Sequence, residues 1–509
     1  AHRFAKQRPE MNTTENWGLF SPQAEAHLQS VMGLQTFNSI RALDFLSELP
    51  DVDTSRLAVT GASGGGTQTF LLSAIDPRVA VSFPAVMVST AMQGGCTCEN
   101  CSDLRVGTGN IEFAALFAPK PLGMSAANDW TKEMTTKGFP ELQQHYRLFD
   151  AEDNVMLISR TEFGHNFNSV SRHAMYHWFN KHLKLGVPEP IQETEIKLLT
   201  QEQMSVWDAE HPKPAGGDEF ERKLLSGWNA DSQKQIRVLD FSADADSEVK
   251  RREFFGGAID VVIGRTLPAA GEVEFAQVDE SDQGSYLRIL GLLRNKPVGE
   301  ELPVVILHPH DWKGRAVVWL DKAGKAGLFD DAGTPMPDIK RLIDGGTSVV
   351  GVDLLYQGEF LADAKPLERT GSVANPREAA AYTFGYNDTV FAKRVHDVLT
   401  VLSFVKHHEL KPKEIGLVGL AGGGHWASAA VAQSGGLLHS AAIDTQGFRF
   451  GNVLDIHSLD FLPGGAKYGD LPAMISLGSV EHLWLTDVVS ERESIQARDR
   501  IAEKWLLGR

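Results

Sequence analysis

Residues 57–68 read LAVTGASGGGTQ, an apolar run that ends in a turn of small residues. The run LAVT predicts a buried strand, and the helical periodicity of GTQTFLLSAI at 66–75 predicts a helix after the turn. Ser63 lies in the turn, within the pattern G-x-S-x-G. Parallel α/β sheets are built from such strand, turn and helix units. The stretch therefore predicts an α/β fold with a serine held above the edge of the sheet.

Helices and strands alternate on both sides of this turn. The stretch MGLQTFNSIRALDFLSEL at 32–49 has apolar residues at helical spacing and ends before Pro50, as a helix does. Apolar runs at 79–86, at 121–129 and at the start of 154–167 predict three more strands. This alternation indicates a parallel sheet that is covered by helices on both faces.

The residues around Ser63 suit a catalytic turn. A turn that holds a serine in a strained conformation needs small neighbours, and Gly61, Ala62, Gly64 and Gly65 supply them. The backbone N–H of Gly64, at the start of the next helix, would point at a developing oxyanion. Glycine-rich turns of this kind also bind phosphates, so the pattern alone leaves both interpretations open.

The two residue types that such a serine requires follow in the right order. Asp129 ends the strand expected at 121–129, and His165 follows the strand expected at the start of 154–167. In α/β-hydrolases the nucleophile, the acid and the histidine come in this order along the chain. The histidine takes the proton of the serine, while the carboxylate holds the imidazole in the productive tautomer. We therefore predict a triad of Ser63, Asp129 and His165.

Other acids and histidines nearby fit this pattern less well. Asp150 and Asp153 precede the strand that delivers His165 and suit the start of that strand better than a catalytic loop. Three further histidines lie in RHAMYHWFNKHL, an expected helix that would spread them over its faces: His173, His177 and His182.

The first part of the chain is similar to a known family. The runs quoted above, with GGCTCENC, LFAPKPLGMSAANDWT and EFGHNF, resemble the acetyl xylan esterase-like hydrolases of the dienelactone hydrolase and prolyl oligopeptidase superfamily over roughly residues 30–185. The resemblance implies a serine carboxylesterase that deacetylates carbohydrate esters such as acetylated xylan and uses no cofactor. It implies Ser63 as the nucleophile, Asp129 as the acid and His165 as the base. Trp130 would lie at the rim and stack on a sugar, or simply pack.

Two other functions remain open at this point. A serine peptidase of the prolyl oligopeptidase type shares the order of the triad, but the sequence has no blade-length repeat of the kind that builds its propeller. A non-catalytic binding or scaffold protein is the other alternative. Ser63, Asp129 and His165 together argue against it.

The second half contains a copy of the opening stretch. Residues 415–426 read IGLVGLAGGGHW, with Ala421 where the first copy has Ser63, and a helical pattern at 391–405 precedes them. A methyl group cannot attack a carbonyl. The glycines are retained, so we expect a hydrolase-like domain kept for structure, for an interface or for holding substrate.

The second copy also lacks the partners of a nucleophile. After a strand expected at 472–478, His482 stands where an acid would be expected, and no later strand and histidine follow. His425 or another nucleophile could take the place of the missing serine, which is the weaker alternative.

These patterns divide the 509-residue chain, which is too long for one core. We expect a catalytic α/β-hydrolase domain at 1–185, a linker and β-rich lead-in at 186–300, and a degenerate α/β-hydrolase-like domain at 301–509. The sheets should be mostly parallel. Further strands are expected at 258–264, 285–293, 302–310 and 348–356, the last two parallel.

The first domain should have an incomplete sheet. A hydrolase has several strands before its nucleophile, and AHRFAKQRPEMNTTENWGLFSPQ at 1–23 resembles none of them. Without them the strand before Ser63 would expose an apolar edge. We expect that a missing N-terminal segment or a partner chain completes this domain and supplies the second oxyanion donor.

Composition narrows the range of partners. The formal charge of −17 argues against nucleic acid, because binding to phosphate backbones needs clustered cations. No stretch approaches the ~18 apolar residues of a membrane span. The compartment is undetermined, with a periplasmic or secreted location weakly favoured.

The only three cysteines, Cys96, Cys98 and Cys101, lie together in GGCTCENC. A disulfide scaffold is therefore excluded. The spacing C-x-C-x-x-C is not a common zinc pattern, and we expect no metal. A local disulfide and packed thiols both remain open.

Overall fold

The computed structural model describes residues 8–91, 94–238, 249–363, 365–374 and 379–487. The chain divides into two compact units. Unit 1 comprises Gln29–Lys223 and Val373–Asn387, and unit 2 comprises Arg8–Leu28, Leu224–Ser372 and the residues from Asp388 onward. Each unit therefore contains a segment from the other half of the sequence.

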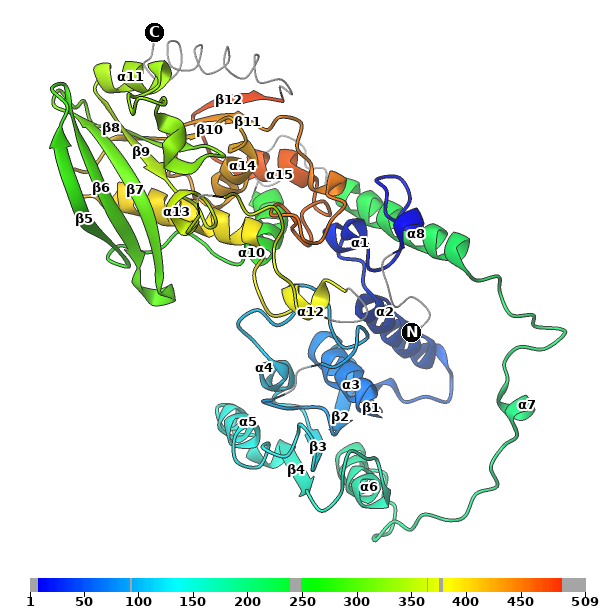
Figure 1. Cartoon of the computed structure of the whole chain (residues 1–509). Helices are drawn as coiled ribbons and strands as arrows, with labels where there is room; N and C mark the ends of the chain where they lie inside the picture. The colour runs from blue at the N-terminus through cyan, green and yellow to red at the C-terminus, as the bar shows by residue number, and fades with distance from the viewer. Residues whose placement is uncertain (1–7, 92–93, 239–248, 364, 375–378, 488–509) are drawn as a thin grey trace. The chain divides into compact units, whose positions relative to one another are not determined.

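Unit 1 is built around a four-stranded parallel sheet in the order β1–β2–β3–β4 (Figure 1). Aromatic and aliphatic side chains of α3 and α5 pack on one face of it, and Trp178 of α6 packs with Val81 and Phe83 on the other. The bounds are β1 Leu57–Ala62, β2 Val79–Ala85, β3 Leu122–Ala127, β4 Val155–Arg160, α2 Val31–Glu48, α3 Gly64–Ile75, α4 Asn110–Ala115, α5 Gly138–Arg147, α6 Ser169–Leu183, α7 Gln201–Met204 and α12 Ala381–Phe384.

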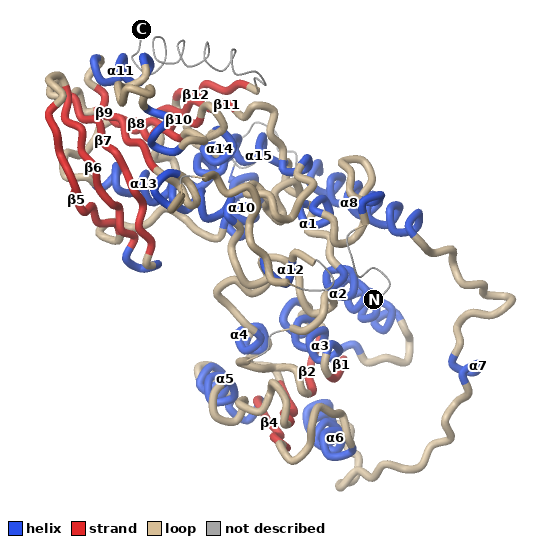
Figure 2. Tube along the Cα trace, in the orientation of Figure 1, coloured by secondary structure: helices blue, strands red, loops and turns tan. Residues whose placement is uncertain are grey.

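Unit 2 contains an eight-stranded mixed sheet in the order β12–β11–β10–β8–β9–β7–β6–β5 (Figure 2). Strands β12 to β9 in this order run parallel, and β7, β6 and β5 are joined by antiparallel pairing. Helices α10, α13, α14 and α15 contribute to the core on one face. The strands are β5 Val273–Asp282, β6 Tyr286–Asn295, β7 Glu300–Pro309, β8 Arg315–Leu320, β9 Thr347–Val352, β10 Glu414–Gly419, β11 Ser440–Asp444 and β12 His482–Thr486; the helices are α1 Pro22–Ala26, α8 Asp218–Val238, α10 Gly257–Ile263, α11 Pro337–Asp344, α13 Val390–His407, α14 Gly424–Gln433 and α15 Asp470–Leu477.

The predicted α/β class is confirmed, and so are most of the predicted elements. The helix expected at 32–49 is α2, and the strands expected at 79–86, 121–129 and 154–167 are β2, β3 and β4. The first sheet has fewer strands than the second, as expected. Within residues 8–56 the structure contains helices and one isolated bridge but no strand of this sheet. In the described part of the chain, β1 therefore pairs only with β2.

Three predictions about individual strands were wrong. Residues 258–264 form helix α10, in which Ile259, Val262 and Ile263 are buried at helical spacing. Residues 472–478 lie largely in helix α15, where Leu471, Met474 and Ile475 repeat that spacing. Short apolar runs do not distinguish strand from helix, and here the tertiary packing chose the helix. The strand at 302–310, β7, is antiparallel to both of its neighbours instead of parallel.

No described helix has the length and apolar character that crossing a bilayer requires.

Candidate active site

The turn at Ser63 has the strained conformation that its small neighbours predict. Ser63 connects β1 to α3 with φ 57° and ψ −125°, and its N–H donates to Ala85 O at 3.1 Å. A Cβ atom on Gly61 would lie 2.5 Å from the carbonyl oxygen of Gly65, and one on Gly66 would lie 2.7 Å from Met87 Cβ. A non-glycine residue at positive φ costs on the order of 1–3 kcal/mol and persists where its surroundings enforce it. The glycines let the backbone approach closely enough to do so.

Asp129 and His165 are joined by a hydrogen bond. Asp129 follows β3 and His165 follows β4, and His165 Nδ1 lies 2.7 Å from Asp129 Oδ2. The Asp129 side chain is 5% exposed and that of His165 is 36% exposed. Because an ionised carboxylate can only accept, Nδ1 carries the proton, and Nε2 is left as the basic nitrogen.

Thr131 orients Asp129, and sequence reasoning missed it. Asp129 Oδ1 accepts hydrogen bonds from the amide of Thr131 at 2.7 Å and from its hydroxyl at 2.5 Å. Thr131 is fully buried, and its Oγ1 also accepts from the amide of Ala127 at 3.0 Å. The signal was present in the sequence NDWT, since aspartate commonly accepts from the backbone two residues ahead in a turn.

Trp130 packs on the imidazole of His165. The ring centroids are 4.5 Å apart with an interplanar angle of 38°. The indole is partly buried and packs against the core cluster of unit 1. Trp130 thus limits rotation of the His165 ring, and its contact with substrate stays a prediction.

Parallel topology brings the predicted residues to one edge. Ser63, Asp129 and His165 follow the carboxyl ends of β1, β3 and β4, which run in the same direction. In open parallel sheets ligands bind at this edge. Among the described residues no hydrogen bond joins Ser63 to His165. Catalytic hydrogen bonds are often long before substrate binds.

The alternative acids and histidines lie away from the Asp129–His165 pair. Asp150 and Asp153 lie between α5 and β4, shortly before β4 begins, as predicted from the sequence. The three other histidines are on α6, where His173 contacts Ser169 O, His177 contacts Glu189, and the ring of His182 packs at a tilt against Trp178.

A second carboxylate lies at the turn, and sequence reasoning did not single it out. Glu99 Oε1 is 3.0 Å from the position that a Cβ atom on Gly64 would take. Glu99 comes from GGCTCENC, whose three cysteines are free thiols. Burial, together with a hydrogen bond to Cys96, raises the pKa of the Cys98 thiol to about 12. The Cys98 thiol is therefore protonated at neutral pH.

The copy in unit 2 keeps the turn without the chemistry. Ala421 has φ 49° and Gly422 has φ 89°, and a Cβ atom on Gly424 would lie 1.9 Å from Asp444 O. His425 is nearly buried in α14 and contacts Asp460 Oδ1 at 3.0 Å. The prediction for His482 needs correction, because it begins β12 instead of following a strand at 472–478.

Replacing Ala421 by glycine should stabilise unit 2. Alanine at φ 49° is strained, whereas glycine populates this region freely, so we expect a gain of about 0.5–1 kcal/mol after the entropy of glycine in the unfolded chain is subtracted. Hydrogen exchange of the β10 amides in urea measures it. Ala430→Gly, within α14, is the matched control and should destabilise by about 1 kcal/mol or more. A loss of stability in Ala421→Gly would show that the turn is not strained there.

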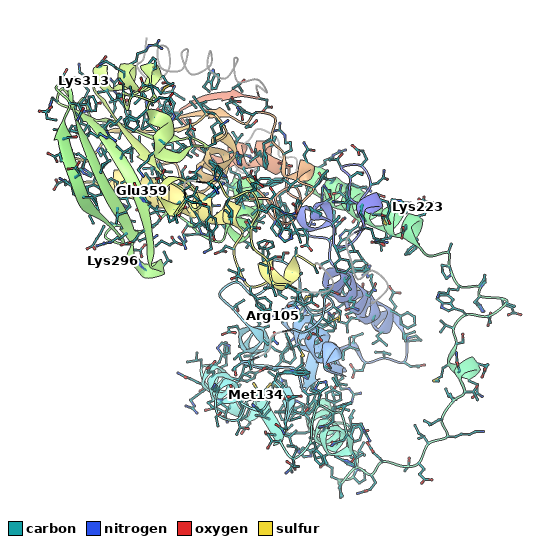
Figure 3. The ribbon with its side chains drawn as sticks, in the orientation of Figure 1. Arg105, Met134, Lys223, Lys296, Lys313 and Glu359 are labelled. Atoms are coloured by element: carbon teal, nitrogen blue, oxygen red, sulfur yellow. The ribbon has the colours of Figure 1, made fainter. Side chains whose placement is uncertain are left out.

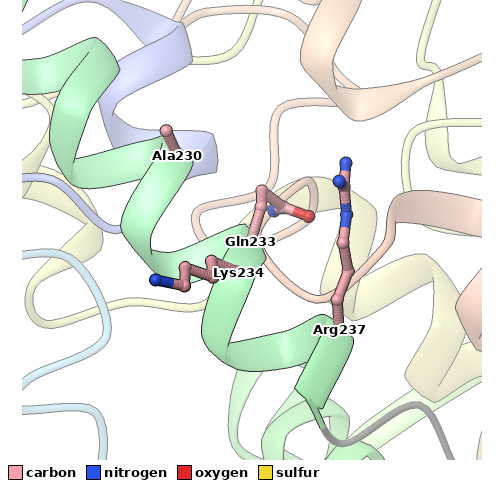
Figure 4. A pocket seen from close by; sticks show the side chains of 4 residues that line it. All are labelled: Ala230, Gln233, Lys234 and Arg237. Carbon is pink, nitrogen blue, oxygen red and sulfur yellow. The ribbon is translucent and has the colours of Figure 1, made fainter.

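Three pockets are lined by residues other than Ser63, Asp129 and His165. One of about 300 Å³ in unit 2 contains a hydrogen bond of 2.8 Å between His308 Nδ1 and Ser348 Oγ, but Ser348 lies in a regular strand without a strained turn. One of about 650 Å³ is lined by Lys325, whose ammonium is paired with Asp353 and Glu359. The third, about 440 Å³, is lined by four residues of α8, Ala230, Gln233, Lys234 and Arg237 (Figure 4).

One group in the described residues has metal-binding spacing. The ligand atoms of His439, Glu481 and His482 all lie within 4.8 Å of one another. His439 Nδ1 already pairs with Glu481 at 2.9 Å, and Glu481 and His482 are exposed. A surface ion pair accounts for this arrangement.

Parts of the chain are similar to solved esterase structures. No protein-family model matches the sequence, and no curated protein matches it. Among solved structures, a methylesterase has 34% identity and a TM-score of 0.28, over 32% of this chain and 37% of its own. Acetyl xylan esterase 1 from Thermoanaerobacterium sp. JW/SL YS485 has 14% identity and a TM-score of 0.27, over 37% and 57%. Glucuronoyl esterase from Solibacter usitatus has 13% identity and a TM-score of 0.32, over 52% and 82%. The chain thus spans little more than a third of the methylesterase that it matches.

Proposed function

We propose that this protein is a serine carboxylesterase acting on carbohydrate esters, with Ser63 as nucleophile, His165 as base and Asp129 as acid. The observation that carries the proposal is the hydrogen bond of 2.7 Å between His165 and Asp129, at the sheet edge where Ser63 lies in its strained turn. A histidine held by a buried carboxylate near a serine in such a turn is the arrangement that activates a hydroxyl.

The reaction runs in two half-reactions. Ser63 Oγ attacks the ester carbonyl and gives its proton to His165 Nε2, which leaves the negative charge on the carbonyl oxygen. The N–H of Gly64, in the first turn of α3, donates to that oxygen, and the helix dipole adds to the stabilisation. The C–O bond breaks, the alcohol takes the proton from His165, and an acyl-Ser63 ester remains. Water then attacks in the same way and releases the acid.

Carbohydrate esters such as acetylated xylan are the proposed substrates. The esters of neutral polysaccharides carry no negative charge, so they suit a protein with a formal charge of −17. Trp130 would contribute an aromatic face beside His165 if a sugar ring reaches it. The similar esterases named above act on esters by name, and this substrate class comes to the present chain as part of the proposal.

The outer edge of β1 would receive a further strand. In unit 2 the equivalent strand β10 pairs on both sides, with β8 and β11, whereas β1 pairs with β2 alone among the described residues. A segment pairing there would place its loop beside Ser63 and supply the second oxyanion donor. Another part of the polypeptide or a partner chain would provide it, and the strand would lie on the side of β1 opposite to β2.

A fluorophosphonate probe tests the proposed nucleophile. Because only Ser63 combines a strained turn with a histidine after a later strand, we expect label on Ser63 and on no other serine in the intact chain. Mass spectrometry of the digested adduct identifies the residue. Ser348, which contacts His308, is the internal control. Label on the Ser63→Ala protein would show that another residue reacts with the probe. If Ser63 is labelled but the protein cleaves prolyl peptides and no esters, the protein is a peptidase.

A further inference from the structure

The loop of residues 94–105 lies against the proposed nucleophile turn through Glu99. While Glu99 Oε1 faces Gly64, Oε2 accepts hydrogen bonds from the amides of Gly95 at 2.6 Å and Cys96 at 3.0 Å. These two donors fix the carboxylate. Oε1 has no hydrogen-bond donor among the described residues, so it remains an acceptor for a ligand bound at the turn.

A segment from the second half of the sequence holds this loop. The chain leaves unit 2 after Ser372, contributes Val373–Asn387 to unit 1, and returns to unit 2 at Asp388. We refer to residues 379–387 of this segment, which include α12, as the strap. The strap has five buried residues: Ala379, Ala380, Ala381, Phe384 and Gly385.

Backbone hydrogen bonds connect the strap to the loop. The amide of Asp103 donates to Phe384 O at 2.8 Å, and the amide of Arg105 donates to Gly385 O at 2.8 Å. The fit is close, because a Cβ atom on Gly385 would lie 3.1 Å from the carbonyl oxygen of Cys101. The loop thus depends on the strap to satisfy two of its amides.

Side chains extend this connection to Glu99. The hydroxyl of Tyr386 donates to Asn100 Oδ1 at 2.8 Å, and Arg105 Nη1 donates to the same oxygen at 2.8 Å and to Glu99 O at 2.9 Å. Arg105, labelled in Figure 3, is 3% exposed, and its guanidinium lies 6.0 Å from the ring centre of Tyr386. Asn100 is 2% exposed. A buried network of this kind allows the loop few alternative conformations.

We propose that the strap is a positioning element of the active site, which holds the 94–105 loop so that Glu99 Oε1 accepts a hydrogen bond from a hydroxyl group of the substrate. The inference rests on the proposed function and specifies its substrates: esters of polyhydroxylated compounds with a free hydroxyl near the acylated position. A carboxylate beside the turn also disfavours esters that carry a negative charge of their own. The second half of the sequence thereby contributes to chemistry in unit 1.

Glu99→Gln tests the recognition step. Glutamine keeps an oxygen for the amides of Gly95 and Cys96 but places an NH₂ donor where Glu99 presents an acceptor oxygen to the substrate hydroxyl. We expect kcat/KM for a partially acetylated xylo-oligosaccharide to fall roughly 10- to 100-fold, mainly through KM. Hydrolysis of 4-nitrophenyl acetate, which has no hydroxyl, should fall by a smaller factor, so the ratio of the two kcat/KM values should change. Equal losses on both substrates, or none on the oligosaccharide, would overturn the role of Glu99.

Tyr386→Phe tests the strap in the full-length chain. It removes only the hydroxyl that donates to Asn100, and we expect the oligosaccharide kcat/KM to fall roughly 3- to 10-fold. The matched control is Tyr176→Phe, on α6. It removes a hydroxyl that donates to Glu193 and should leave the kinetics on both substrates unchanged. If the strap acts through Glu99, the variant with both Tyr386→Phe and Glu99→Gln should be no slower than Glu99→Gln alone. Multiplying losses would contradict that route.

Two measurements test the strap without relying on catalysis. In Tyr386→Phe the amides of Gly95 and Cys96 should exchange faster with solvent, and iodoacetamide should alkylate Cys98 several-fold faster, because the loop opens more often. Wild-type rates for both in Tyr386→Phe and in Tyr386→Ala would overturn the positioning role. If wild-type protein hydrolyses no ester while these rates do rise, the proposed function fails and the strap still holds the loop.

Discussion

Ser63→Ala should lower kcat for 4-nitrophenyl acetate by roughly 10⁴-fold or more, the largest effect that we expect of any single substitution. Removing the hydroxyl removes the acyl-enzyme route, and His165 cannot compensate because it has no nucleophile to deprotonate. Residual hydrolysis would come from substrate binding and from the Gly64 amide, which would still stabilise the negative charge on the carbonyl oxygen when a water molecule attacks. Initial rates with purified protein measure it. Ser55→Ala, at the exposed turn before β1, is the matched control and should have wild-type rates.

The same experiment addresses the copy in unit 2. Adding Ala421→Ser to Ser63→Ala should restore no activity, since a serine without a base stays protonated. The Nε2 atom of His425 is hydrogen-bonded to Asp460. The centre of its ring lies 4.6 Å from the ring centre of Trp426 and 4.7 Å from that of Phe448. A clear gain in the double variant would instead identify a dormant second site. Near-normal rates in Ser63→Ala alone would remove Ser63 from the mechanism.

Asp129→Asn should lower kcat by roughly 10³-fold or more while the fold is kept. Thr131 would still donate to the amide oxygen, so the NH₂ group of the asparagine would face His165 Nδ1. An amide donor there requires Nδ1 to accept, which puts the imidazole proton on Nε2. That tautomer cannot take the proton from Ser63, and catalysis stops at its first step.

Asp150→Asn and Asp153→Asn are the controls for this result, because both were alternative acids and neither contacts His165. Both should retain wild-type rates. Thr131→Val should show an intermediate loss, because it removes one of the two hydrogen bonds that orient Asp129 and does not change the charge of the carboxylate. If Asp129→Asn proves as active as wild type, the 2.7 Å contact has no part in catalysis and another acid must be sought.

The sequence carried enough local information to predict the strained turn and its companions. Small residues around Ser63 permit a tight turn, and the order of Asp129 and His165 along the chain matches that of α/β-hydrolases. Directions and pairings that depend on distant residues were less accessible. The strand β7 runs antiparallel because it pairs with β6 and β9, and nothing in LPVVILHPH encodes that.

Glu99 and the strap were missed for the same physical reason. The sequence GGCTCENC offered cysteines as its conspicuous feature, whereas the functional inference concerns the glutamate between them. That glutamate gains significance only because Gly64 is its neighbour in space and because Tyr386 is bonded to Asn100, 286 positions away. Periodicity and motifs describe neighbours along the chain, so contacts over such separations leave no local signal.

Each unit includes one segment from the other half of the sequence, and this exchange affects folding during synthesis. Asn12 donates a hydrogen bond to Leu454 O, a partner 442 positions later, and Gln23 donates to Val453 O, 430 positions later. At about 5–20 residues per second, a ribosome releases the first partner roughly 20 to 90 seconds before the second. Met11, Leu19 and Phe20, which are buried in the finished protein, lie in the same early segment and are also synthesised before the late part of unit 2. Neither unit can finish folding before residues from the second half of the sequence have been synthesised. Apolar segments of the nascent chain therefore stay exposed during synthesis, and we expect the yield of folded protein in the cell to depend on chaperones that bind such segments.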